Sequence, residues 1–216
     1  MTHARRADVD FFADISCPWC YVGWEALKRA AAERTNLCVN LNWRTFLLNP
    51  DMPAEGYERG AYLAAKFPDR ARLEAIHEAL AAAARDVGAP LAFDRITRTP
   101  STVNAHRLIL WAAGQGRAEA AVDALFAAMF AEGRDIGDAA VLRDIAEAIG
   151  LDAGLVGELL ASDADRAAIA ARHNAATRLG VTGVPVVIIN QKAVLMGAET
   201  PEAYGGALDQ CAAPVA

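Results

Sequence analysis

Two cysteines separated by two residues, Cys17 and Cys20, are the strongest chemical signal in this sequence. Thiols at this spacing can close a small disulfide ring and pass that oxidation to another dithiol by exchange. The alternatives are half of a zinc site or two unrelated core thiols. A closed structural zinc site needs four ligands, and the chain has no second pair with this spacing. We therefore predict a redox-active dithiol and no bound metal.

The tetrapeptide Cys17-Pro18-Trp19-Cys20 stands at the start of a segment with helical spacing. Unpaired N–H groups and the positive end of the helix dipole at such a position favour a thiolate at Cys17. Cys20 lies one turn further in, where we expect it to be buried. The spacing thus predicts that Cys17 attacks a disulfide and that Cys20 releases the mixed disulfide. Pro18 stiffens the turn, and Trp19 is expected at the rim, where packing and substrate contact remain open alternatives.

A strand, a helix and a second strand are predicted around this turn. The apolar run 9–15 predicts a buried strand, and Ser16 is the expected N-cap of a helix that continues to about Arg34. Residues 39–46 alternate in polarity, as a second strand would. Elements in this order favour a parallel strand pair joined by a crossover helix.

The middle of the chain shows helical spacing without a clear strand pattern. The stripe within Val122–Phe130 is expected to be core rather than a cofactor site. Asp138, Asp152 and Ser162 are the expected N-caps of three further helices.

Strand character returns near the C-terminus. Apolar residues within 184–196 surround a turn at Asn190-Gln191-Lys192, which predicts a β-hairpin. Thr200 and Pro201 then have the residue types expected at the cap and first position of a final helix. The predicted organisation is an α/β chain in three parts: 1–48, an inserted helical domain 49–180, and 181–216.

Composition excludes several classes of function. The chain has 216 residues and a formal net charge of −6, so it lacks the basic footprint of a nucleic-acid-binding protein. No apolar run approaches the length that spans a bilayer, and the first six residues lack the pattern of a signal peptide. We expect a cytoplasmic protein without membrane contact, in which a close cysteine pair is catalytic rather than structural. Cys38 and Cys211 are expected to be packing thiols.

The sequence resembles the DsbA-like branch of the thioredoxin superfamily, and specifically the FrnE-type oxidoreductases. The resemblance extends over nearly the whole chain and involves several blocks in order: Asp14–Gly23, Arg44–Pro50, Asn104–Leu108, Arg134–Asp138 and Gly180–Pro185. Two departures stand out. Gln191 occupies a hairpin position where such chains commonly carry Gly, and Cys211 stands without a second Cys motif near the C-terminus.

The resemblance implies a thioredoxin-like fold with a helical domain inserted after the second strand. It also implies a cis Val184–Pro185 bond that lies against the cysteine pair. The Val184 backbone would then pair with an extended substrate segment, and Pro185 would prevent metal capture by the thiols. Pro18 and Trp19 complete the expected substrate-binding residues. The expected partners are protein or small-molecule thiols and disulfides, with glutathione as a candidate redox partner and no cofactor built in; the chain is expected to be a monomer or homodimer.

Two other functions remain open from the sequence. The related 2-hydroxychromene-2-carboxylate isomerases and kappa-class glutathione transferases share the inserted-helix architecture, but they generally carry Ser where Cys17 stands. The second of these hypotheses is a non-catalytic binding module with the same fold. His106 is expected to be a helix-packing residue, with orienting the substrate or acting as a base near the thiols as the alternatives. Asp14 and Glu25 flank the active turn and are expected to be solvated, with a proton-accepting role for Cys20 as the alternative.

Overall fold

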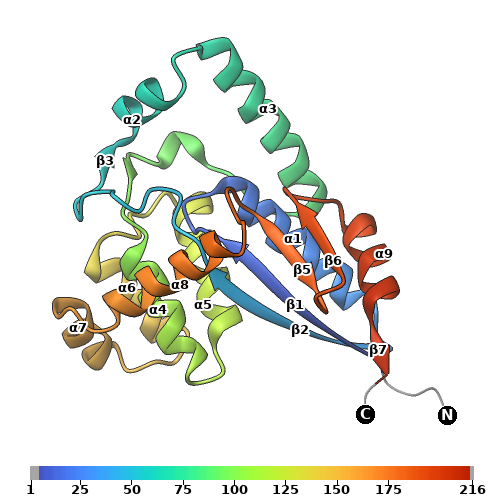
Figure 1. Cartoon of the computed structure of the whole chain (residues 1–216). Helices are drawn as coiled ribbons and strands as arrows, with labels where there is room; N and C mark the ends of the chain where they lie inside the picture. The colour runs from blue at the N-terminus through green and yellow to red at the C-terminus, as the bar shows by residue number, and fades with distance from the viewer. Residues whose placement is uncertain (1–4, 215–216) are drawn as a thin grey trace.

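The centre of the molecule is a mixed sheet built on β1 (Arg5–Ala13), as seen in the computed structural model, which describes residues 5–214 (Figure 1). β2 (Leu37–Thr45) pairs with β1 in parallel. β5 (Val186–Ile189) pairs with the other edge of β1 in antiparallel orientation, and β6 (Ala193–Met196) pairs with β5. The predicted parallel pair and C-terminal hairpin are therefore confirmed.

Helices cover both faces of this sheet because side chains of β1 alternate between two apolar clusters. On one face, α1 (Pro18–Ala32) and α9 (Pro201–Cys211) pack over Phe11 and its neighbours. On the other face, Phe12 belongs to a smaller cluster to which α8 (Arg166–Arg178) contributes Ala176. The sheet is thus buried on both sides, which fits the apolar character of its central strand.

The segment between β2 and β5 is mainly helical and forms the left and upper parts of Figure 1. α3 descends from the top of this view and packs against α1. Besides α8, the elements of this segment are β3 (Tyr57–Glu58), α2 (Arg59–Lys66), α3 (Arg70–Val87), η1 (Phe93–Arg95), β4 (Arg98–Thr99), α4 (Val103–Ala113), α5 (Ala118–Phe126), η2 (Ala127–Ala131), α6 (Ala139–Ala148) and α7 (Ala153–Ala161).

The predicted stripe within Val122–Phe130 is buried core, as expected. Asp138 and Asp152 cap α6 and α7 by accepting hydrogen bonds from backbone N–H groups, which confirms both predictions. The prediction for Ser162 is wrong. Its hydroxyl donates to the Leu159 carbonyl 2.8 Å away, so it serves the end of α7. α8 begins instead after Asp165, which has a left-handed φ and no side-chain cap.

Three short elements were not expected from the sequence. β3 and β4 pair with each other inside the helical segment, so this segment is not free of strands. β7 (Ala213–Pro214) pairs with the start of β1. Pairs of two residues are too short to show a periodic pattern.

The hairpin between β5 and β6 turns at Asn190 and Gln191, which have φ values of 48° and 57°. Such left-handed residues are what a type I′ hairpin turn requires. The Asn190 side chain also accepts from Asp8 N at 2.8 Å and donates to the Cys211 carbonyl at 2.9 Å. Thr200 caps α9, as predicted, by accepting from Ala203 N at 3.2 Å.

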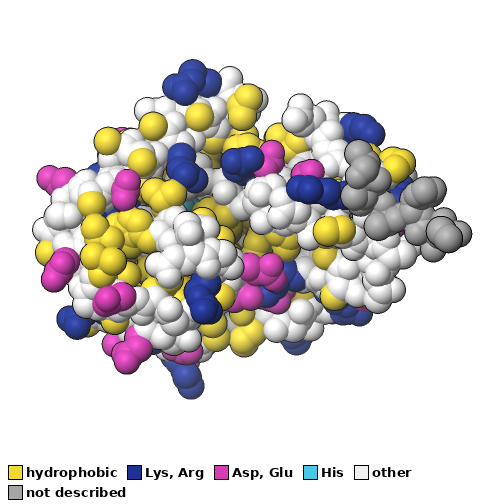
Figure 2. Space-filling model, turned by 90° about the horizontal axis from the view of Figure 1, so that it is seen from below, with side chains coloured by type: hydrophobic (Ala, Val, Ile, Leu, Met, Phe, Trp, Pro, Cys, Tyr) yellow, Lys and Arg dark blue, Asp and Glu magenta, His cyan; other side chains and the backbone are white. Residues whose placement is uncertain are grey.

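Charged side chains of both signs are interspersed over the face shown in Figure 2. Within residues 5–214, no helix has both the length and the apolar character needed to cross a bilayer. The division at residues 48 and 180 stays a prediction. Residues 1–4 and 215–216 lie outside the described residues. They include most of the N-terminal segment that was predicted not to be a signal peptide.

Candidate active site

Cys17 is the N-cap residue of α1, one position later than the Ser16 cap predicted from the sequence. Its carbonyl accepts from Cys20 N at 3.0 Å and from Tyr21 N at 3.2 Å. Pro18 takes the first helical position, as expected. Since a cap residue precedes the unpaired N–H groups of the first turn, the Cys17 sulfur stands at the positive end of the helix.

The loop before β5 meets Cys17 from the other end of the sequence. The Val184–Pro185 peptide bond is cis, as the resemblance implied. Cys17 Sγ lies 3.8 Å from the Val184 carbonyl oxygen, within the range of a weak S–H···O hydrogen bond. Thus the two segments that carry the six predicted site residues meet at the tip of α1.

The two thiols differ in their surroundings. Cys17 keeps 5% of its surface exposed, whereas Cys20 is completely buried. Burial raises the pKa of the Cys20 thiol well above its usual range, and the neighbouring Cys17 and the charge of Asp14 add to this effect. Cys17 is therefore the more accessible of the two thiols, while the raised pKa keeps the Cys20 thiol protonated.

Asp14 is not a solvated surface residue, which corrects the sequence-based expectation: only 1% of it is exposed. One oxygen, Oδ1, accepts from Ser16 N at 3.2 Å, and the other, Oδ2, accepts from Leu48 N at 2.7 Å. His106 Nε2 approaches Oδ1 to 3.5 Å, and His106 Nδ1 accepts from Trp43 Nε1 at 3.3 Å. A buried polar chain therefore connects the loop before α1 with β2 and α4.

The electrostatics of Asp14 favour its charged form. Burial alone raises its pKa, but His106, the Leu48 N–H and Thr102 together outweigh burial, so the pKa lies below its usual value. A carboxylate so stabilised is a poor proton acceptor. The sequence held one signal for this residue: an Asp between apolar neighbours at the end of a buried strand needs polar partners.

Gly23 explains how the loop before β5 can pack so closely on α1. A Cβ atom there would lie 3.4 Å from Pro185 Cγ and 3.2 Å from the Tyr204 hydroxyl. The second distance is tighter than ordinary van der Waals contact, so a larger side chain would push these groups apart. Glu25, by contrast, is half-buried on α1 and pairs with Lys28 at 3.0 Å.

A cavity of about 340 Å³ opens beside Cys17. It lies between the tip of α1 and the elements α2, α3 and η1, and Pro18 and Trp19 form part of its wall. Val184 and Pro185 do not line it. The predicted substrate-binding residues are therefore divided between the cavity and the loop before β5, with Cys17 between the two.

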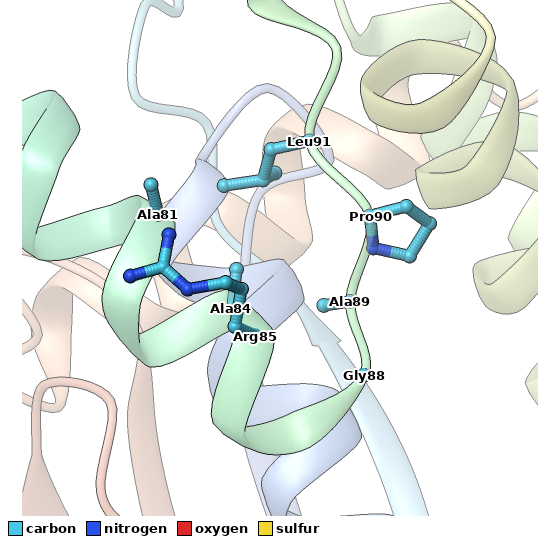
Figure 3. A pocket seen from close by; sticks show the side chains of 7 residues that line it. All are labelled: Ala81, Ala84, Arg85, Gly88, Ala89, Pro90 and Leu91. Atoms are coloured by element: carbon cyan, nitrogen blue, oxygen red, sulfur yellow. The ribbon is translucent and has the colours of Figure 1, made fainter.

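A different hollow lies at the C-terminal end of α3 (Figure 3). Its wall consists of small and apolar side chains with the single charged residue Arg85. None of the predicted site residues lines it, and it contains no nucleophile. We therefore assign no chemistry to it.

The remaining cysteines stand apart from the pair. Cys211 is buried, as a packing thiol should be, whereas Cys38 is exposed, which corrects its expected role. Among residues 5–214, no three His, Cys, Asp or Glu side chains gather in a way that could hold a metal ion.

Comparisons with known proteins add family relationships to this geometry. The model of the DSBA-like thioredoxin domain family matches residues 8–209. A probable DsbA oxidoreductase from Streptomyces coelicolor is 32% identical and superposes with a TM-score of 0.83, covering 95% of this chain and 89% of its own.

Two more distant structures show the same fold. The cytosolic disulfide reductase DsbM from Pseudomonas aeruginosa, solved with GSH, is 22% identical with a TM-score of 0.66, over 94% of this chain and 98% of its own. A 2-hydroxychromene-2-carboxylate isomerase is 18% identical with a TM-score of 0.71, over 94% and 95% of the two chains. A search among curated proteins gave no match.

Proposed function

Because the chain belongs to the family of DSBA-like thioredoxin domains, we propose that it is a FrnE-type thiol–disulfide oxidoreductase or isomerase. Cys17 is the nucleophile and Cys20 the resolving thiol. The observation that carries this proposal is the asymmetry of the pair. Cys17 stands at a helix tip 3.8 Å from the Val184 carbonyl, while Cys20 is fully buried one turn below it.

The proposed reaction has two exchange steps. The Cys17 thiolate attacks one sulfur of a substrate disulfide R–S–S–R′, so that a Cys17–S–R bond forms and R′–S⁻ leaves and is protonated by water. Cys20 then gives its proton to solvent and attacks Cys17 Sγ, which forms the Cys17–Cys20 disulfide and expels R–S⁻. Two electrons have passed from the dithiol to the substrate, and the same steps in reverse oxidise a substrate dithiol.

Two surfaces beside Cys17 receive substrate in this proposal. Val184, next to the cis bond, offers its backbone to an extended substrate segment, and Pro185 keeps a metal ion from the thiols. Pro18 and Trp19 contact the part of the substrate that enters the cavity. No metal or organic cofactor takes part.

The proposed partners are protein or small-molecule disulfides and thiols in the cytoplasm. Glutathione is the proposed redox partner that returns the enzyme to its starting state. The fold shared with DsbM, whose structure contains GSH, supports glutathione as the first reductant to test.

The test is reduction of insulin disulfides by the wild-type protein and by single serine variants. We expect Cys17→Ser to lower turnover at least ~100-fold, because the attacking sulfur is gone. Cys38→Ser is the matched control, since this exposed thiol lies on β2 and should leave turnover unchanged. Wild-type turnover no greater than that of Cys17→Ser would contradict the proposal. Equilibration of the wild-type pair against glutathione buffers then gives the reduction potential, which decides between oxidase or isomerase and reductase.

A glutathione-dependent isomerase or transferase is the second candidate, because the cavity beside Cys17 is of the size that small molecules occupy. The two candidates differ in their need for sulfur at position 17. Glutathione-transfer activity that survives Cys17→Ser would favour the second candidate over the first.

A further inference from the structure

The cavity beside Cys17 combines apolar walls with one sign of charge. Leu63, Phe67, Leu73, Ile76 and Leu80 supply aliphatic and aromatic surface from α2, α3 and the turn between them. The charged residues of the wall are Arg59 and Lys66, and no Asp or Glu from the described part of the chain lines it. Such a wall suits a ligand with an apolar body and a negative charge.

Arg59 is the basic group that is set into the wall. It is the first residue of α2, and its backbone N–H donates to the Thr97 carbonyl at 3.0 Å, which fixes the start of the helix. Its guanidinium carbon lies 5.5 Å from the centre of the Phe93 ring. Burial lowers the pKa of Arg59, and no carboxylate among residues 5–214 offsets this. A partly buried guanidinium without an acidic partner can pair with an anionic ligand.

The nearest acid in the sequence is used elsewhere. Glu58 caps α2, where its carboxylate accepts from Gly60 N at 2.8 Å and from Ala61 N at 2.6 Å. These bonds explain why Glu58 does not neutralise its neighbour Arg59.

The Phe93 ring contacts both Arg59 and His77. The His77 ring stacks on the Phe93 ring, with ring centres 4.7 Å apart and an interplanar angle of 27°. Burial, followed by the charge of Arg59, lowers the pKa of His77, so His77 is neutral at pH 7. The fixed positive charge inside the wall therefore comes from Arg59.

Lys66 lies at the rim of the cavity and already forms a hydrogen bond within the protein. It donates to the Tyr62 hydroxyl at 2.8 Å, and that hydroxyl donates to Asn49 Oδ1 at 2.9 Å. This chain fastens the segment after β2 to α2 and completes the edge of the cavity. Since Lys66 is exposed, water weakens its attraction for a ligand more than that of Arg59.

We propose that this cavity binds a small apolar molecule with a carboxylate, and that Arg59 pairs with that carboxylate while Cys17 faces the apolar body or its sulfur. A ligand that reacts with Cys17 would be an apolar thiol or disulfide that carries an acid group. This part of the inference rests on the proposed function. It assigns to Arg59 the selection of anionic over neutral substrates.

The test separates binding from redox chemistry by using Cys17→Ser, which cannot form a mixed disulfide at position 17. Calorimetry measures the affinity of this variant for 2-naphthoate and for 2-naphthamide, which have the same apolar body and differ in charge. We expect naphthoate to bind about tenfold more tightly, because a charge-assisted bond to Arg59 forms only with the acid.

Arg59→Gln in the Cys17→Ser background should remove the preference for naphthoate. Arg59→Lys should keep part of it, since a point charge remains without the planar fork. Arg72→Gln, on the exposed side of α3, is the matched control and should keep all of it. Equal affinity for the acid and the amide, no binding of naphthoate, or an unchanged preference in Arg59→Gln would each overturn the proposal. None of these results depends on the insulin assay, so failure of either proposal is recognised separately.

Discussion

Cys17 and Cys20 are identical residues, and the two thiols differ in what surrounds each sulfur. Cys17 precedes a helix whose first N–H groups are unpaired, whereas Cys20 is enclosed by core residues that raise its pKa. The spacing of the pair and its place before a helix were enough to predict that Cys20 is buried, and the structure confirms this burial. The buried Asp14 and its partner His106 were not predicted, because their contact depends on residues 92 positions apart in the sequence.

We expect Asp14 to act on Cys20 through its charge, not as a proton acceptor. Its charge helps raise the Cys20 pKa, while its own pKa lies below the usual carboxyl value. We therefore expect Asp14→Asn to shift Cys20 alkylation to lower pH, measured with iodoacetamide in the Cys17→Ser background.

The control for this prediction is Glu25→Gln, which removes a carboxylate from α1 that is not among the groups shifting the Cys20 pKa. A purely structural role for Asp14 predicts a less stable variant with an unchanged alkylation midpoint. That result would contradict an electrostatic effect of Asp14 on the Cys20 pKa.

At the scale of single elements, local signals predicted several helix starts correctly, and the helix end expected at about Arg34 lies two residues beyond the observed end at Ala32. Asp138, Asp152 and Thr200 cap helices as their sequence neighbours suggested. The prediction that Ser162 caps a helix was wrong because a distant side chain, Arg107, organises the turn after α7. α2 was missed because it is eight residues long and buries none of them fully.

The hairpin turn contains a residue whose conformation suits glycine better. Gln191 has a φ of 57°, where a side chain is strained. We expect Gln191→Gly to raise the free energy of unfolding by about 0.5–1 kcal/mol, since glycine adopts this conformation without strain. Urea unfolding measures the change. Lys192→Gly, in the same loop without positive φ, should lower stability instead, and equal effects of the two variants would contradict the explanation.

Arg107 organises the turn after α7 from its position on α4. Its guanidinium donates to the carbonyls of Leu159, Ser162 and Ala164 and to Asn104 Oδ1. Arg107→Met removes these hydrogen bonds, although the Leu159 carbonyl keeps the Ser162 hydroxyl as a donor. We therefore expect the free energy of unfolding to fall by about 3 kcal/mol.

The matched control is Arg172→Met on the exposed surface of α8, which should change stability by less than about 0.5 kcal/mol. Thermal and urea unfolding of both variants provide the comparison. Equal stability of the Arg107 and Arg172 variants would show that water replaces the lost donors.

At the scale of the whole molecule, the helical segment and the sheet meet at the cysteine pair. The sequence and its family resemblance predicted the thioredoxin-like α/β fold with helices inserted after β2, and the comparisons confirm the family and fold. The cavity was beyond prediction, because Trp19 of α1, Arg59 of α2 and Phe93 of η1 become neighbours only through the inserted helices.

The Asp14–His106 contact joins these two parts and gives stability a dependence on pH. The pKa of Asp14 in the folded protein is below its ordinary value of 3.8. Its contribution is therefore fully present above about pH 4–5 and is lost as pH falls through the folded pKa. Urea unfolding from pH 6 to pH 2 should show a steeper loss of stability in the wild type than in Asp14→Asn. Parallel curves for the two proteins would contradict this linkage.

Trapping the mixed disulfide distinguishes attack by Cys17 from release by Cys20. Cys20→Ser is mixed with glutathione disulfide, and intact-mass spectrometry with peptide mapping locates the adduct. We predict one glutathione on Cys17 of Cys20→Ser, and an internal Cys17–Cys20 disulfide without adduct in the wild type. Absence of an adduct on Cys17, together with a wild-type pair that stays reduced, would show that Cys17 is not the attacking thiol.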